Sequence, residues 1–240
     1  MNKMNYYAIF TDQSGKDGSP VFFEARMFEE PITGYAFSKE NSIYYEWMKP
    51  GFNDYELLPE YYLYSKCVDL EFDYYKFANH YIISEDFLAV ISKYNVAYTK
   101  GRVQVFSAED NSQLVLRKNY FFVKFDYIND LIDYTKSIYE VSLSDKGEPI
   151  VHNGVRYIRK YEKIELIDEN ICSEIFLIKD SILGFNLFCT GQFKIDAENM
   201  KVYALMFVAL PDYLDFVKYS GFLGKETYER LKKRDIPDIM

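Results

Sequence analysis

Apolar and polar positions alternate in short runs along most of the chain, and these runs predict a protein built mainly from strands. Between residues 28 and 60 no period holds, and three prolines and two glycines predict irregular structure there. The predicted strands are Tyr6–Thr11, Val21–Met27, Val103–Phe106, Gln113–Leu116, Tyr120–Phe125, Tyr157–Leu166 and Ile175–Ile178.

A helix is predicted to begin after Ser84, whose hydroxyl can accept a hydrogen bond from a free backbone N–H of the first turn. The two acids that follow Ser84 suit the positive end of the helix dipole. Phe87, Leu88, Ile91 and Tyr94 lie at helical spacing, and Asn95 ends the pattern. Two more helices are predicted near the end of the chain, over Asp212–Tyr219 and Lys225–Arg234.

Two segments resemble each other, residues 84–96 and residues 190–202. Each begins with a hydroxyl residue, Ser84 or Thr190, followed by Phe three positions later and by Val twelve positions later. A strand-like run follows both segments, which indicates a repeated strand–helix–strand unit. The sequence thus predicts an α+β fold, mainly antiparallel sheets with a few short helices, and allows two strand–helix–strand sub-units.

The run Val151-His152-Asn153-Gly154-Val155 predicts a two-residue β-hairpin. Asn-Gly between strand-like runs favours a type I′ turn, because both central residues of that turn need positive φ. We expect the second strand of this hairpin to continue into Tyr157–Leu166.

Residues 52–75 combine acids with aromatic residues at high density. They hold six acids, one base and eight aromatic residues. Tyrosine supplies a large contact area with few rotatable bonds, and acids around it select a basic partner. This predicts a partner-binding surface made by Asp54, Glu56, Glu60, Tyr61, Tyr62, Asp69, Glu71 and Asp73. The alternative is an ordinary loop and strand whose tyrosines cover the edge of the core.

The net charge of −9 argues against nucleic-acid binding and favours a basic protein partner. The longest apolar run, Val202–Leu210, is shorter than the ~20 residues that span a bilayer. The N-terminus has no apolar stretch of the kind that signal peptides carry. Three cysteines at long spacings predict reduced, buried thiols. We therefore expect a cytoplasmic protein that does not bind membranes.

Residues able to carry out catalysis are few. The chain has two histidines, His80 and His152, and it lacks the motifs of metalloproteases, serine hydrolases and P-loop proteins. An acid-rich run includes Glu162 and Glu165, but alternation along a strand would point these two side chains to opposite faces. We expect no enzyme, no cofactor and no metal site.

Several runs resemble the immunity proteins of bacterial polymorphic toxin systems, in particular immunity protein family forty-three and its relative, family eleven. The resemblance extends from about Tyr81 to Leu210, and it rests on Ile83–Leu88, Tyr120–Phe125, Asp133, Ser137–Tyr139, Ile175–Ile178 and Thr190–Val202. The helix at 190–202 departs from the family pattern, since Thr190-Gly191 stands where the family tends toward Ser-Glu. The resemblance implies an α+β protein that binds and neutralises a cognate toxin domain, without catalysis or cofactor.

Two organisations of the chain stay open. In the first, residues 1–80 form a β-rich variable region that carries the acidic segment, residues 52–75, and residues 81–240 form the immunity-like core with C-terminal helices. In the second, the whole chain is one continuous domain. Two functions other than immunity are a small hydrolase that reverses a toxin's modification and a structural or assembly module. The sequence leaves the oligomeric state open.

Overall fold

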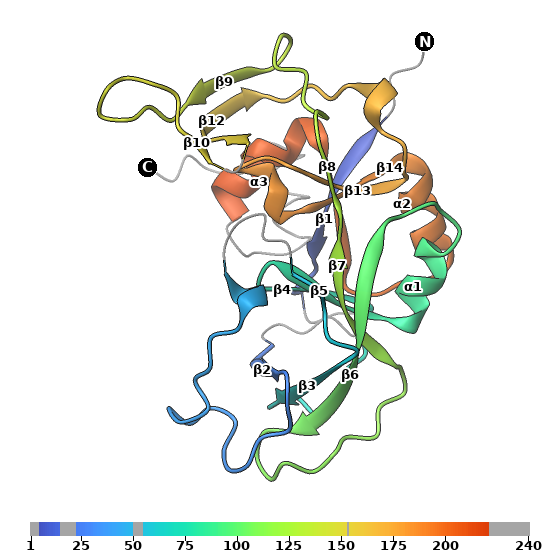
Figure 1. The fold of residues 1–240 in the computed structure, drawn as a ribbon. Coiled ribbons are helices and arrows are strands. Elements are labelled where there is room, and N and C mark those ends of the chain that lie inside the picture. The colour runs from blue at the N-terminus through green and yellow to red at the C-terminus, as the bar shows by residue number, and fades with distance from the viewer. Residues whose placement is uncertain (1–4, 15–22, 50–54, 153, 221–240) are drawn as a thin grey trace.

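The computed structural model describes residues 5–14, 23–49, 55–152 and 154–220 of this chain. Within these residues the chain forms two larger sheets, two short two-stranded ribbons and three α-helices (Figure 1). Most strand pairs are antiparallel, and this confirms the predicted α+β class.

The larger sheet has six strands in the order β2-β3-β6-β7-β5-β4. All its neighbours are antiparallel except β3 and β6, which run parallel. Residues on both sides of residue 80 therefore share one hydrogen-bonded sheet. Its strands are β2 (Ala25–Phe28), β3 (Glu60–Ser65), β4 (Tyr74–Phe77), β5 (His80–Ser84), β6 (Tyr98–Ser107) and β7 (Tyr120–Phe125).

The second sheet has five strands in the order β15-β1-β14-β13-β8, and only its edge pair, β13 with β8, is parallel. These strands are β1 (Tyr6–Thr11), β8 (Tyr127–Ile128), β13 (Ile175–Ile178), β14 (Leu187–Thr190) and β15 (Leu205–Ala209). The α-helices are α1 (Glu85–Ile91), α2 (Gly191–Asn199) and α3 (Tyr213–Ser220), and four single 3-10 turns are η1 (Glu46–Met48), η2 (Asp168–Asn170), η3 (Leu183–Phe185) and η4 (Leu210–Asp212).

The two sheets contain the same four-stranded unit. In the six-stranded sheet the unit is β6-β7-β5-β4, and in the five-stranded sheet it is β15-β1-β14-β13. In each unit an antiparallel pair of strands leads into a helix, β4-β5 into α1 and β13-β14 into α2. The strand after the helix, β6 or β15, runs parallel to the strand before the helix, and one antiparallel strand, β7 or β1, lies between the two. In the second unit that central strand is β1, which comes from the start of the chain. The predicted pair of strand–helix–strand sub-units is confirmed.

The register of the strands repeats as closely as their order. Ser84 pairs with Tyr120 in the first unit, and Thr190 pairs with Tyr6 in the second. The hydroxyl of Ser84 accepts a hydrogen bond from the N–H of Phe87, and Thr190 does the same for Phe193, as the sequence repeat predicts. The two units therefore share the hydrogen bond that caps the helix and the pairing of the capping residue, as well as the order of their strands.

A shared core joins the two units. Phe87 of α1 and Phe193 of α2 meet edge to face at 5.8 Å between ring centroids, and the two helices lie side by side (Figure 1). Side chains of both sheets pack around these two rings, including Tyr81 and Leu187. Further buried clusters lie with each sheet, one around Trp47 and one around Tyr213.

Several predicted element limits need correction. The helix at 84–94 ends at Ile91, and Tyr94 lies beyond it, where its hydroxyl donates to Asp196 at 2.5 Å. The segment Gln113–Leu116 is no strand: it forms one isolated bridge to Phe106, and Val115 is fully exposed. The strand at 21–27 begins only at residue 25, with residues 21–22 outside the described part, and the strand at 157–166 is the shorter β12 (Ile158–Lys163). The predicted helix at 225–234 lies outside the described residues.

Gly101 of β6 sits where the sheet leaves no room for a side chain. A Cβ atom there would lie 2.2 Å from the backbone oxygen of Leu58 and 2.8 Å from the ring of Tyr61. We expect Gly101→Ala to lower the free energy of unfolding by about 1–3 kcal/mol, as overpacking does in other cores. Gly191 is the matched control, because a Cβ there would meet nothing closer than 3.8 Å. Urea unfolding of both variants measures the difference, and equal stabilities would contradict the account.

Candidate partner-binding surface

The acidic segment runs along β3 and into β4. Glu56 and Glu60 lie before or at the start of β3, whereas Asp69 and Glu71 lie beyond its end. The chain turns back after β3: the Tyr120 hydroxyl donates to the carbonyls of Leu70 and Phe72, and Tyr120 lies in register with Val103 and Tyr61, near the start of β3. Asp54 lies outside the described residues.

Two predicted partner-binding residues are corrected by their burial. Tyr61 is 1% exposed and Asp73 is fully buried, so neither belongs to an exposed surface. The hydroxyl of Tyr61 accepts a hydrogen bond from the N–H of Leu58 at 3.0 Å. Its ring packs on Phe122, with 4.8 Å between centroids.

Asp73 holds together three segments of the chain. Its carboxylate accepts hydrogen bonds from the Ser84 hydroxyl at 2.5 Å and from the backbone N–H of Tyr203 at 2.7 Å. Lys118 Nζ lies 2.5 Å from the same carboxylate and 3.2 Å from Asp86. Because Tyr203 belongs to the second unit, this buried network ties the two units to each other. In the second unit, Glu174 accepts a hydrogen bond from the Thr190 hydroxyl in the place that Asp73 takes in the first.

The aromatic residues of the acidic segment belong to the core and its edge. Of the seven that the structure describes, four are buried and three are half-buried, and none is exposed. Their hydroxyls find partners inside: Tyr64 accepts from the N–H of Ile32, and Tyr74 donates to the carbonyl of Ile9. Of the two tyrosines predicted to bind a partner, Tyr61 is therefore a core residue, whereas the half-buried Tyr62 stays a prediction.

The exposed acids of the segment differ in their partners. Glu71 forms an ion pair with Arg117 at 3.1 Å. Glu60 is half-buried and accepts a hydrogen bond from the Tyr62 hydroxyl at 2.9 Å. A hydrogen bond from Gln104 and the one from Tyr62 hold the pKa of Glu60 below its usual range. Among the acids of this segment that the structure describes, Glu56, Glu60, Asp69 and Glu71 are therefore the ones at the surface, available to solvent or a partner.

His80 is buried at the start of β5. Its Nδ1 lies 3.2 Å from the Tyr55 hydroxyl, and its ring stacks on Phe122 at 5.1 Å between centroids. Burial, with a smaller effect from the positive charge of Lys124, lowers the pKa of His80 to about 3. The ring is therefore neutral at physiological pH, while His152 is exposed on β10 (Val151–His152).

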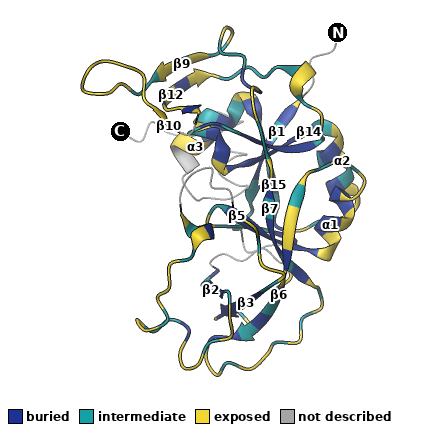
Figure 2. Cartoon of the chain, viewed as in Figure 1, coloured by how far each residue is buried: buried dark blue, intermediate teal, exposed yellow. Residues whose placement is uncertain are grey.

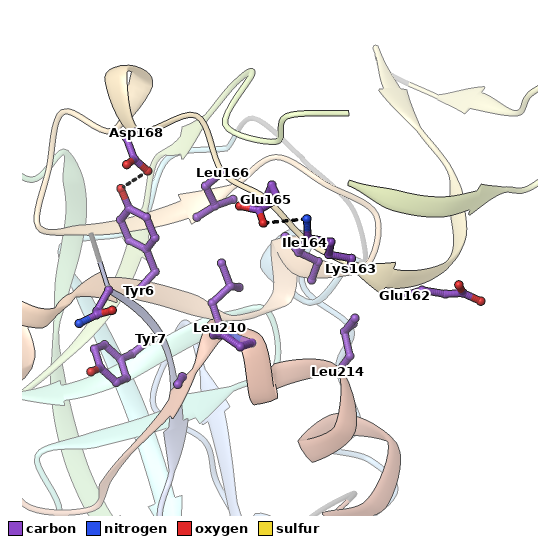
Figure 3. Close-up of a pocket in the computed structure, with 13 residues that line it drawn as sticks. Tyr6, Tyr7, Glu162, Lys163, Ile164, Glu165, Leu166, Asp168, Leu210 and Leu214 are labelled. Atoms are coloured by element: carbon purple, nitrogen blue, oxygen red, sulfur yellow. Dashed lines mark hydrogen bonds and ion pairs between the residues drawn. The ribbon is translucent and has the colours of Figure 1, made fainter. Parts of the chain in front are cut away.

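A cavity of about 330 Å³ opens between the start of β1 and the segment after β12 (Figure 3). The Tyr6 hydroxyl donates to Asp168 at 2.9 Å, and Lys163 lies 3.0 Å from Glu165. Burial and the contact with Asp168 raise the pKa of Tyr6. Glu162 is directed away from Glu165 (Figure 3) and pairs with Lys160 at 2.8 Å. The acids around this cavity are thus engaged one by one with separate donors.

Three further observations concern chemistry in the described part of the chain. No three His, Cys, Asp or Glu side chains there are grouped so that they could hold a metal ion. No helix there is long and apolar enough to cross a bilayer. All three cysteines are unpaired, but only Cys189 is buried, so the prediction of buried thiols is wrong for the half-buried Cys67 and the exposed Cys172.

Sequence reasoning missed an arm at residues 138–163. It contains β9 (Ile138–Val141) paired with β12, and the hairpin of β10 with β11 (Val155–Arg156). The predicted hairpin forms, with His152 paired with Val155 and Gly154 at φ +75°, while Asn153 of the predicted turn lies outside the described residues. The apolar residues beside this turn were the available signal, and they indicated a hairpin without showing that its side chains are exposed.

The fold is that of an α+β protein with a duplicated unit, acids at its surface and a projecting arm. The family model described as Immunity protein 43 matches residues 30–220, so the chain belongs to this family of immunity proteins. The match begins before the acidic segment, which therefore lies inside the family region, whereas the resemblance in the sequence begins only near residue 81. A search of curated proteins gives no match.

Proposed function

We propose that this protein binds and neutralises a cognate toxin domain in the cytoplasm of the cell that makes the toxin. The family match over residues 30–220 is the observation that carries the proposal. The chain acts by direct contact, with no catalytic step and no cofactor. A standard interface of about 1,600 Å² in total is sufficient for such binding.

The charge of the chain favours a basic toxin domain. With a net charge of −9, the protein attracts a basic partner from a distance and speeds the encounter. Glu56, Glu60, Asp69 and Glu71 come before and after β3 in the chain, and as surface acids they add to this attraction. Tyr62 donates to Glu60, one of these acids.

Co-expression tests the proposal. Candidate toxin domains, taken from open reading frames that neighbour this gene, are expressed one at a time from an inducible promoter, with or without this chain. We expect growth to be restored by the wild-type chain and not by an unrelated acidic protein of similar size. A folded chain that gives no protection at an equal or higher level than the toxin would contradict the proposal.

A further inference from the structure

The arm, residues 138–163, stands out from the upper left of the molecule in Figure 1, and Figure 2 shows β9 and β12 largely exposed. Its base is fixed to the body. The Tyr161 hydroxyl donates to the buried Asp180 at 2.8 Å, and the N–H of Ile158 donates to the Ser181 hydroxyl at 2.8 Å. The arm is therefore positioned by the core while most of its length is open to solvent.

The arm exposes an unusual share of apolar side chains. Sixteen large apolar side chains are exposed in the described part of the chain, and five of them lie on these 26 residues. Large exposed apolar side chains cost free energy in water, and where several occur on one part of a soluble protein they commonly mark an interaction site. The five are Ile138, Leu143, Ile150, Val151 and Tyr157, between 39% and 59% exposed.

A cavity of about 280 Å³ lies beside Val151, one of these five residues, and two cationic side chains line it. Arg156 and Lys179 line it, together with Val151 of the apolar set and the acid Asp130. Neither cation forms an ion pair with a carboxylate of the described residues. The Arg156 guanidinium is held in place by the Tyr139 hydroxyl at 3.2 Å and by the Tyr134 ring at 5.5 Å. A guanidinium held in this way is suited to binding a carboxylate.

Local charge also sets the arm apart. In a chain of net charge −9, residues 138–163 carry five bases and four acids. Two of the five bases, Lys160 and Lys163, are paired with neighbouring acids, and Arg156 faces the cavity without such a partner. A partner group that complements this site is therefore a carboxylate with apolar surface beside it.

We propose that the arm and the adjoining cavity form the docking surface for the toxin domain. The toxin presents an apolar patch against Leu143 and Val151, and one of its carboxylates, from Asp, Glu or the chain end, enters between Arg156 and Lys179. The size is suitable, since standard interfaces use about 20–30 residues from each partner. This inference rests on the proposed function and adds the surface through which it works.

The arm and the acids have different kinetic roles in this proposal. Charges distant from a contact mainly change the association rate, and they do so less at high salt. Buried apolar anchors and a buried charge pair mainly change the dissociation rate. The surface acids Glu56, Glu60, Asp69 and Glu71 therefore speed the encounter, and the arm determines how long the complex lasts.

Surface plasmon resonance tests the surface, with the purified toxin domain against which this chain protects in the co-expression experiment. We expect the double variant Leu143→Ser/Val151→Ser, and separately Arg156→Glu, to raise Kd at least ~30-fold, mostly through faster dissociation. The matched controls are Val115→Ser, which removes a fully exposed apolar side chain elsewhere, and Lys39→Glu, an exposed cation far along the chain from the arm. Both controls should bind within about threefold of wild type, as residues outside an interface do.

The comparison with Glu56→Lys/Asp69→Lys completes the test. This variant should slow association by less than ~10-fold at low salt, and the effect should disappear at high salt. Thermal unfolding of every variant checks that it is folded. If the arm variants bind like wild type while wild type binds tightly, the docking surface is overturned and the proposed function stands. If folded wild type does not bind the toxin domain, both fall.

Discussion

Asp73→Ala is expected to lower the free energy of unfolding by about 3–5 kcal/mol, because it breaks a buried ion pair and leaves its partners unsatisfied. The carboxylate is fully buried and accepts from Ser84, from Lys118 and from the backbone N–H of Tyr203. After its removal the Lys118 cation, 17% exposed, keeps the Asp86 carboxylate at 3.2 Å and the Tyr203 ring, with its centroid at 5.3 Å. The same substitution also loosens the connection between the two repeated units.

The neighbouring acid Glu71 supplies the matched control. It too forms an ion pair, with Arg117, but both side chains are largely in water, at 50% and 87% exposure. Glu71→Ala should change the free energy of unfolding by less than about 1 kcal/mol, because exposed pairs contribute little. Urea unfolding of both variants gives the comparison. A loss below 1 kcal/mol for Asp73→Ala would show that the network does not hold the fold together.

Acidification is expected to destabilise the protein through His80. Its pKa is about 3 in the folded protein and about 6.5 when unfolded. Between these values the unfolded chain binds a proton that the folded protein does not bind. The free energy of unfolding is therefore unaffected by the titration of His80 above pH 6.5. It decreases as the pH falls, by about 2–3 kcal/mol between pH 6.5 and 4.5.

His80→Gln isolates this effect, because an amide keeps an acceptor for the Tyr55 hydroxyl and does not titrate. We expect the unfolding free energy of the variant to depend less steeply on pH than that of wild type. The difference in slope should correspond to about one bound proton, measured by urea unfolding at several pH values. His152→Gln, at the chain's other histidine, which is exposed on β10, is the control for replacing an imidazole by an amide. Equal slopes for wild type and His80→Gln would contradict a buried, neutral His80.

The repeated unit could be predicted because its signals are local. A hydroxyl cap at Ser84 or Thr190, followed by Phe three positions later, depends on contacts within one helical turn. The part played by β1 could not be predicted, since it fills the second unit from the other end of the chain, and no local pattern records such long-range pairing. The shared register of Ser84 with Tyr120 and of Thr190 with Tyr6 becomes visible only when the sheets are formed.

The partner-binding surface was harder to predict than the fold. Composition located acids and tyrosines in residues 52–75, but it could not separate an acid such as Asp73, whose partners lie 11, 45 and 130 positions away, from one that faces solvent. Tyrosine is compatible with both core and surface, and here core packing decides its place. For the arm the difficulty is the reverse, because Val151 and Ile150 have the sequence pattern of buried strand residues and yet are exposed.

Titration calorimetry of the purified chain with the toxin domain identified by co-expression tests the central claim most directly. We predict a one-to-one complex with Kd below about 0.1 μM, a value consistent with an interface of standard size. A catalytic protector would instead act well below one equivalent of toxin, without a lasting complex. No binding at about 10 μM of each folded protein, or protection at a small fraction of one equivalent, would contradict neutralisation by direct contact.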